Sequence, residues 1–185
     1  NIKDLHLENT KIETTAKGGI KVNEHLQTSV PNIYAMGDVT GNPQFTYISL
    51  DDFRIITDQL FGNAQRSTKD RATFAYCSFL NPPFARIGLT EKQALEQGYT
   101  IKVWKLEWAA IPKARILGKA QWLLKAVIDE KTGLILGASL YCSEAHEMIN
   151  IISLAMKRNL PYTALSSHIF THPTMSEALN DLFKL

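Results

Sequence analysis

Two short segments of the sequence carry side chains at spacings that could do chemistry. In the first, residues 171–177, the imidazole of His172 lies five residues before the carboxylate of Glu177. Pro173 restricts the backbone between them, and a helix start would fix the carboxylate, so the two groups could form an oriented pair for proton transfer. Glu177 is equally well explained as the third residue of a capping box that begins at Thr174. The spacing alone leaves both interpretations open.

The second segment ends an apolar run, residues 33–36, with the pair Gly37 and Asp38. A glycine at a strand end allows a ligand to approach the backbone closely, and the carboxylate that follows can accept hydrogen bonds from a sugar or polyol hydroxyl. Glycine followed by aspartate is also the ordinary composition of a turn. The pair therefore indicates either a ligand-binding strand end or a plain turn.

The hydrophobic pattern predicts the elements that would position the second segment. Short strands are expected between Gly18 and Val39, where β-branched residues alternate with polar ones. A helix is expected from about Ile48 to Phe61, and Gly62 stands where a glycine would end it. The apolar positions with helical spacing are Leu50, Phe53, Ile56 and Leu60.

A polar and charged stretch from Gly62 to Thr73 indicates a linker between two compact units, which we place at residues 1–66 and 67–185. The second unit is expected to contain a sheet, with a hairpin turn from Asp129 to Gly133. The strands are expected at residues 73–79, 86–89, 101–108, 121–129 and 134–141.

Three helices are expected around this sheet. Thr90 and Gln93 form a capping box for a short helix that ends at Gly98. Ser143 is the expected N-cap of a helix that reaches about residue 158. That helix is apolar around most of its girth, so it should be covered on more than one side, for which another subunit is a candidate. A final helix should begin after Pro173, with a buried stripe at Met175, Ala178, Leu179, Leu182 and Phe183.

Composition excludes several classes of function. The 185 residues are 45% hydrophobic and 21% charged, with a net charge of +2 and no basic run, so neither nucleic acid nor an anionic membrane is an expected partner. The longest apolar stretch, residues 148–156, is far too short to span a bilayer. Cys77 and Cys142 fit two buried, reduced thiols of a cytoplasmic protein, and no metal site is expected. The first residues, without an initiator methionine, indicate a piece of a longer protein.

Taken together and in this order, the two chemical segments resemble those of the class I pyridine nucleotide-disulfide oxidoreductases. In this family, which includes glutathione reductase, dihydrolipoamide dehydrogenase and mercuric reductase, Gly-Asp near the end of the FAD domain is followed by a dimerisation domain that ends in His-Pro-Thr-x-x-Glu. The resemblance covers essentially the whole chain. Residues 44–52 and 146–151 resemble most the reactive-chlorine-resistance flavoproteins, which reduce hypothiocyanous acid.

The resemblance implies an α+β fold: a mostly antiparallel sheet with flanking helices, the dimerisation domain, beside a remnant of the FAD-binding domain. It implies that Gly37 and Asp38 bind FAD, with Asp38 at a ribityl hydroxyl or the neighbouring phosphate region. Phe45 and Thr46 would lie at the flavin ring. Many relatives have Thr-Pro-x-Ala where this chain has Thr-Tyr-Ile-Ser from residue 46, so the contact with the flavin ring is less well defined than that of Asp38.

The resemblance further implies that His172 is an acid/base that projects into the redox site of a partner subunit, with Glu177 orienting it. A carboxylate favours the charged imidazolium, which can stabilise a thiolate. The implied cofactors are FAD and NADPH or NADH, the implied assembly is a homodimer through residues 67–185, and the implied substrate is a small-molecule oxidant.

The chain lacks both a Gly-x-Gly-x-x-Gly fingerprint and a pair of redox cysteines, so it is expected to be inactive on its own. The alternatives are a non-catalytic dimerisation or binding module, and a metal-ion or dihydrolipoamide reductase.

Overall fold

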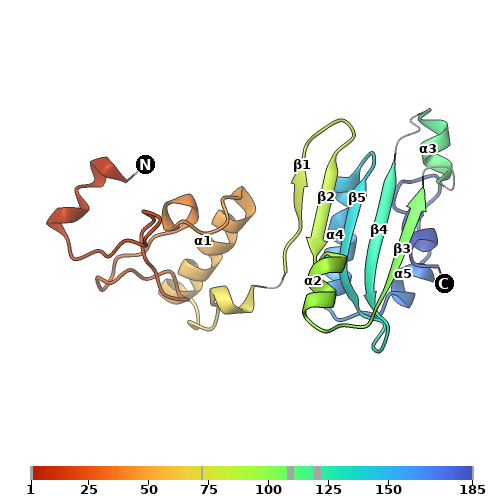
Figure 1. Cartoon of the computed structure of the whole chain (residues 1–185). Coiled ribbons are helices and arrows are strands. Elements are labelled where there is room, and N and C mark those ends of the chain that lie inside the picture. Colours follow the sequence, from red (N-terminus) through yellow and green to blue (C-terminus); the bar gives the residue numbers. More distant parts are fainter. Residues whose placement is uncertain (1, 72, 108–110, 119–121, 185) are drawn as a thin grey trace. The chain divides into compact units, whose positions relative to one another are not determined.

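The computed structural model describes residues 2–71, 73–107, 111–118 and 122–184. The chain divides into two compact units, Asn1–Ala72 and Thr73–Leu185 (Figure 1). This division falls a few residues beyond Arg66, the end of the first unit expected from the sequence. The identity of the two units as the end of an FAD-binding domain and a dimerisation domain stays a prediction.

The first unit is built on one long helix, α1 (Thr46–Phe61). Among the described residues of this unit, four short 3₁₀ helices accompany it: Lys3–Leu5, Leu7–Asn9, Gly37–Thr40 (η3) and Thr68–Asp70. The prediction of strands between residues 18 and 39 was wrong. The described residues of this segment pair only through isolated bridges, such as that of Val22 with Thr28. Tight turns explain this: Leu26 and Asn32 have positive φ and reverse the chain before a ladder can extend.

Helix α1 begins two residues before its expected start and ends at Phe61 as expected. Gly62 has a φ of −112°, so it does not end the helix in the left-handed conformation. Instead the Asp58 carboxylate accepts backbone N–H groups of Arg66, Gln65 and Asn63. These hydrogen bonds, that of Arg66 first, lower the pKa of Asp58.

The buried face of α1 differs from the expected one. Ile48, Asp52 and Ile55 are buried, whereas Leu50 and Phe53 of the expected stripe are exposed, as is Leu60. The helix carries two apolar stripes, and in this unit the stripe that includes Ile48 and Ile55 faces the interior. Periodicity identified a helix but could not decide between its two faces.

The second unit is a five-stranded antiparallel sheet in the order β1-β2-β5-β4-β3. The strands are β1 (Tyr76–Ser78), β2 (Phe84–Gly88), β3 (Ile101–Glu107), β4 (Leu123–Asp129) and β5 (Ile135–Tyr141). The antiparallel sheet expected from the sequence is confirmed, and all five expected strands overlap the observed ones. Trp108 and Gln121, two of the expected strand ends, lie outside the described residues.

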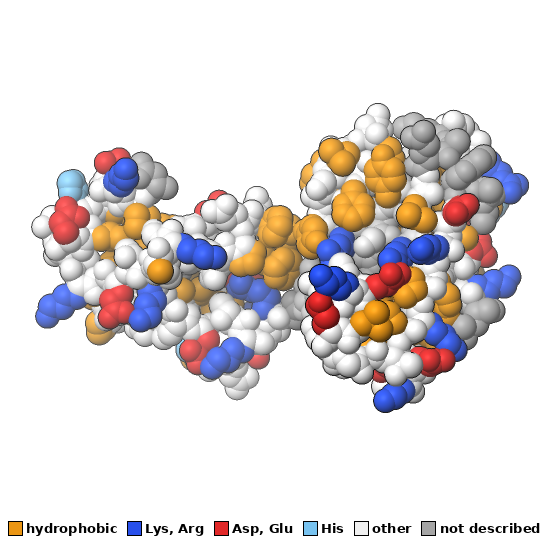
Figure 2. All heavy atoms as spheres, in the orientation of Figure 1, with side chains coloured by type: hydrophobic (Ala, Val, Ile, Leu, Met, Phe, Trp, Pro, Cys, Tyr) orange, Lys and Arg blue, Asp and Glu red, His pale blue; other side chains and the backbone are white. Residues whose placement is uncertain are grey.

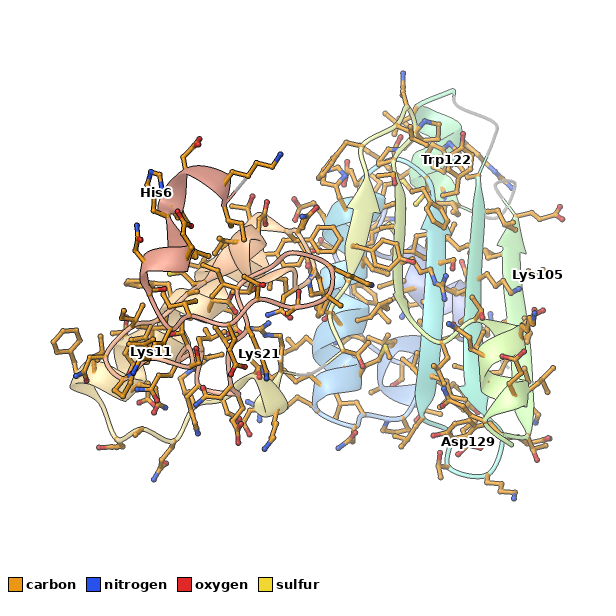
Figure 3. All side chains as sticks on the ribbon, turned by 60° about the vertical axis from the view of Figure 1, so that its left-hand side comes forward. His6, Lys11, Lys21, Lys105, Trp122 and Asp129 are labelled. Carbon is orange, nitrogen blue, oxygen red and sulfur yellow. The ribbon has the colours of Figure 1, made fainter. Side chains whose placement is uncertain are left out.

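The β4–β5 hairpin turns where the sequence indicated. The Asp129 carboxylate accepts the Thr132 hydroxyl at 2.6 Å and the Lys131 N–H at 3.2 Å, and Gly133 follows with a φ of 70°. Figure 3 shows Asp129 at this turn and Trp122 near the opposite end of β4. The hydrogen bond from Thr132 is the main cause that lowers the pKa of Asp129.

Helices cover both faces of the sheet (Figure 1). α2 (Glu91–Glu96) lies on one face, with the expected capping box: Gln93 N donates to Thr90 Oγ1 at 3.1 Å, and Thr90 N to Gln93 Oε1 at 2.9 Å. α4 (Ala145–Lys157) packs on β2 and β5, and α6 (Ala178–Leu182) on β3 and β4. α3 (Pro112–Ile116) and α5 (Thr163–Ser166) were not predicted, because five and four residues are too few to show a helical period.

Two helix starts differ from the prediction. α4 has Glu144, not Ser143, as its N-cap residue, because Glu144 is left-handed with a φ of 59° and Ala145 N donates to the Cys142 carbonyl in a preceding turn. α6 begins at Ala178, after the turn that contains the expected capping box. The expected stripe of the last helix is nevertheless fully buried in the core of the unit.

The surface of the second unit is mixed in charge. In the face that Figure 2 shows, acidic and basic side chains are interspersed with hydrophobic ones. None of the helices in the described part of the chain has the length and apolar character that crossing a membrane requires.

We predict that Leu140→Ala lowers the free energy of unfolding by about 2 to 5 kcal/mol, because this β5 side chain is completely buried in the core. Denaturant unfolding monitored by circular dichroism measures the change. Leu95→Ala, at an exposed position of α2, is the control and should stay within about 0.5 kcal/mol of wild type. Equal effects of the two substitutions would contradict the assignment of this core.

Candidate functional site

The Gly37–Asp38 pair lies in η3, in contact with α1. Gly37 is buried with a φ of 71°, and a Cβ atom there would lie 2.7 Å from Ser49 Oγ, so a larger residue would both strain the backbone and collide. Thr40 Oγ1 donates to the Gly37 carbonyl at 2.8 Å. Asp38 itself is exposed, so this turn presents its carboxylate at the surface.

An ion pair between the buried Asp52 and the partly buried Arg71 lies next to this turn. Gly37 N donates to Asp52 Oδ2 at 2.8 Å, and the completely buried Asp52 pairs through Oδ1 with Arg71. Arg71 Nε also donates to Asp51 Oδ2 at 2.8 Å. Burial alone would lower the pKa of Arg71, but its hydrogen bonds to Asp52 and Asp51 outweigh burial and raise it.

Sequence reasoning missed Asp52 and Arg71. A signal for Asp52 was present, because Ile48, Asp52 and Ile55 share one helix face at spacings of four and three. A carboxylate at the centre of an otherwise apolar stripe indicates a buried, partnered acid. No comparable signal marks Arg71 in the sequence.

Phe45 and Thr46 form the start of α1, the helix that η3 contacts. Phe45 is the N-cap residue and supplies no side-chain cap, and the first turn holds no acidic residue. The Phe45 ring stacks on Tyr47 with 5.1 Å between centroids, and Thr46 is exposed. The amide dipoles at this helix start favour an electron-rich or anionic oxygen.

In the second unit, His172 and Glu177 are hydrogen-bonded, with 2.7 Å between Nδ1 and Oε2. A carboxylate can only accept, so the ring carries a hydrogen on Nδ1, and in the neutral imidazole Nε2 then has the lone pair. The His172 side chain is 67% exposed and that of Glu177 only 16%. The arrangement presents an oriented base at the surface, while its catalytic role stays a prediction.

Glu177 also fulfils the alternative interpretation of the sequence. Its Oε1 accepts the Thr174 N–H at 3.2 Å, and Glu177 N donates to Thr174 Oγ1 at 3.3 Å, which are the two bonds of a capping box. Thr174 Oγ1 in turn donates to the Thr171 carbonyl at 2.8 Å. One carboxylate therefore both ties the turn and orients the imidazole.

Both cysteines are free thiols, but only Cys142 is buried, and Cys77 is partly exposed, in contrast to the expectation of two buried thiols. Burial, with a smaller contribution from the negative charge of Glu144, raises the pKa of Cys142 to about 12. Burial also raises the pKa of Cys77. Within the described ranges, no three His, Cys, Asp or Glu side chains gather as they would around a metal ion.

Comparison with protein-family models decides the family. Residues 74–183 match the dimerisation domain of the pyridine nucleotide-disulphide oxidoreductases, and residues 1–52 match a second model named pyridine nucleotide-disulphide oxidoreductase. The chain belongs to this family. The resemblance inferred from the two chemical segments is thereby confirmed, as is the membership of an enzyme family.

Individual relatives of this oxidoreductase chain agree. It is 53% identical over 181 residues to the probable pyridine nucleotide-disulfide oxidoreductase RclA of Escherichia coli K12, covering 98% of the chain and 41% of that protein. It is 35% identical to a mercuric reductase of Staphylococcus aureus, covering 97% of the chain and 32% of that protein. The solved structure of the HOCl-induced flavoprotein disulfide reductase RclA from E. coli matches with a TM-score of 0.98 and 51% identity, covering 100% of this chain and 42% of the other.

The chain thus spans about two fifths or less of the length of these relatives. FAD and NAD(P)H are the cofactors of the family, in agreement with the expectation from the sequence. The residues present fit FAD, since an exposed carboxylate on Asp38 suits a polyol hydroxyl, and the start of α1, with no acidic residue in its first turn, suits an electron-rich oxygen.

We predict that iodoacetamide at pH 8 labels Cys77 in the native oxidoreductase chain well before Cys142. With a pKa of about 12, roughly one Cys142 thiol in ten thousand is ionised at that pH, and its side chain is also inaccessible. Peptide mass mapping measures the labelling, and guanidinium chloride should make both thiols reactive. Native Cys142 reacting as fast as denatured Cys142 would contradict the burial of this thiol.

Proposed function

We propose that this chain is the carboxy-terminal part of an FAD-dependent oxidoreductase of the NAD(P)H:disulfide type. In this proposal residues 1–66 are the end of the FAD-binding domain, and residues 67–185 form the homodimer interface. They also supply the His172–Glu177 acid/base pair to the redox site of the partner subunit. The observation that carries the proposal is the 2.7 Å hydrogen bond that orients an exposed imidazole within a domain of the dimerisation family.

In this proposal His172 transfers a proton to the group that leaves the substrate. When bound, FAD would carry electrons from NAD(P)H to a redox disulfide outside this chain. A thiolate of the reduced disulfide would form a bond to the oxidised substrate as the bond to the leaving group breaks, and that leaving group would need a proton. His172 donates this proton from Nε2, since Nδ1 is engaged by Glu177. The Glu177 carboxylate accepts Nδ1–H before and after the transfer and so keeps the ring in place.

The first unit contributes to flavin binding. Asp38 would accept a hydrogen bond from a ribityl hydroxyl or lie near the phosphate region, and Gly37 would allow the backbone to approach closely. Thr46 would present its backbone amide to the flavin ring from the start of α1, with Phe45 beside it. These assignments are supported by the exposed Asp38 carboxylate and by the absence of a side-chain cap on α1.

The proposed substrate is hypothiocyanous acid or a related reactive oxidant. It is supported by the E. coli relative, which is described as an HOCl-induced flavoprotein disulfide reductase. A metal ion is the second candidate, favoured by the mercuric reductase relative and by a solved Cu(II) complex of E. coli RclA. NAD(P)H oxidation by the complete enzyme, with each oxidant or metal ion in turn, distinguishes them. We further propose a cytoplasmic enzyme without a nucleic acid or membrane partner.

The proposed homodimer needs an apolar surface, and α4 offers one. Leu154 is 61% exposed on the outward side of this helix. At the start of the helix the ring of Phe79, 80% exposed, lies 5.7 Å from that of His146. We propose that a second copy of the chain covers this surface, as expected for a helix apolar around most of its girth.

We predict that His172→Ala lowers the turnover number of the complete enzyme by about 100-fold or more, because it removes the proton donor. Flavin content, measured by absorbance, should not change. His6→Ala is the matched control, because His6 also pairs with a carboxylate, that of Glu8 at 3.0 Å, on an exposed surface. Wild-type turnover in His172→Ala would refute the catalytic role and favour the alternative of a non-catalytic dimerisation module.

We predict that Leu154→Asp weakens self-association of the 185-residue chain by roughly 30-fold or more, because a carboxylate would replace an apolar contact in the interface. Sedimentation equilibrium measures the dissociation constant, and the wild-type chain should be a colourless dimer. Leu95→Asp, on the exposed side of α2, is the control and should leave the dimer intact. A wild-type monomer, or a Leu154→Asp dimer as tight as wild type, would contradict this interface.

A further inference from the structure

The segment that carries His172 has little burial to hold it in place. Residues 167–169 and 171–173 are exposed, and Ile169 reaches 93% exposure. Within the segment only Phe170 packs against the core, where its ring also contacts that of His168 with 4.6 Å between centroids. A segment with so little apolar contact must be fixed by hydrogen bonds if the imidazole is to keep one position.

Asn180 supplies hydrogen bonds at the beginning of this segment. Its Nδ2 lies 2.8 Å from the Leu165 carbonyl, 3.2 Å from that of Ser166 and 2.9 Å from that of His168. The first two carbonyls belong to the end of α5, where a helix leaves its last carbonyls without intrahelical partners. The third belongs to the exposed segment itself. The amide therefore caps α5 and holds the chain four residues before His172.

The far end of the segment is held by Thr174 and Glu177, through the bonds described above. Both ends are thus attached to residues 174–180, which include Glu177 and most of the buried α6. Asn180 lies three residues after Glu177, about one helical turn along the chain. The carboxylate that orients His172 and the amide that holds its segment are therefore carried by one rigid stretch.

We propose that Asn180 is a positioning residue for the His172–Glu177 pair, an inference that rests on the function proposed above. The two N–H groups of the amide face three carbonyl oxygens, which only a donor can satisfy. Replacing Asn180 by aspartate keeps the shape of the side chain but directs a carboxylate at those oxygens. The segment then separates from α6, and His172 no longer keeps Nδ1 on Glu177.

The first test measures the ring itself in the 185-residue chain. Nuclear magnetic resonance of ¹⁵N-labelled histidine reports which ring nitrogen of His172 carries the hydrogen in the neutral form. The wild-type chain should show the Nδ1–H tautomer, and both Asn180→Asp and Asn180→Ala should lose that predominance. Asn180→Ala introduces no charge, so agreement between the two variants excludes a purely electrostatic effect of the new carboxylate.

Ser167→Ala is the matched control. Ser167 is the C-cap residue of α5, and its hydroxyl donates to the Thr163 carbonyl at 2.8 Å. Ser167→Ala therefore removes a side-chain hydrogen bond of α5 but leaves the hydrogen bonds of Asn180 in place. Its His172 tautomer should match wild type. Wild-type tautomers in both Asn180 variants would overturn the proposal. An equal loss in Ser167→Ala would also overturn it, because the effect would then be a general loosening of α5.

The second test is kinetic and uses the complete enzyme. Asn180→Asp and Asn180→Ala should lower the turnover number roughly ten- to hundredfold through misplacement of His172, with unchanged flavin content. In a His172→Ala background the same Asn180 substitutions should cause no further loss of turnover. If Asn180 were merely structural, its substitution would lower turnover in that background as well. An additive loss in that background would overturn the proposal. Loss of the Nδ1–H tautomer in the Asn180 variants of the 185-residue chain, together with normal turnover of the complete enzyme carrying His172→Ala, would support the positioning role and refute the proposed function instead.

Discussion

The turn at residues 171–177, which carries the exposed His172, depends on one carboxylate. Glu177 uses one oxygen to accept the Thr174 N–H and the other to accept Nδ1–H of His172. Capping and orientation, which the sequence offered as alternatives, are two hydrogen bonds of the same carboxylate. Because the carboxylate is far less exposed than the imidazole, water competes less for it, and the hydrogen bond can hold the more exposed group.

The core of the unit fixes that carboxylate in turn. Ala178, Leu179 and Leu182 of α6 are buried against β3 and β4, in the same core that buries α4. Only five residues of α6 are helical, too few for a stable isolated helix, so tertiary packing maintains it. The position of the exposed His172 imidazole is thus determined by the packing of a short apolar stripe that never reaches the surface.

The sequence predicted best where local chemistry and long-range packing agree. The Thr90 capping box and the turn at Asp129 form as expected, because their partners lie within three residues. The expected strands near Val22 did not form, because pairing there is interrupted by turns that depend on individual backbone conformations. The exposed face of α1 and the left-handed Glu144 could not be predicted, since each depends on which surface the rest of the chain covers.

The candidate sites follow the same division. Gly37, Asp38, His172 and Glu177 were proposed as site residues because short motifs carry them. Asp52 was missed although it shares a helix face with Ile48 and Ile55, and its partner Arg71 has no comparable signal in the sequence. Yet Asp52 and Glu177 have the same structural role: each is a shielded carboxylate that accepts a backbone N–H beside an exposed candidate residue, Asp38 or His172. Burying a charge such as that of Asp52 is costly unless it is paired, and Arg71 provides the pair. In both units, therefore, a shielded carboxylate holds a surface motif in place by accepting a backbone N–H.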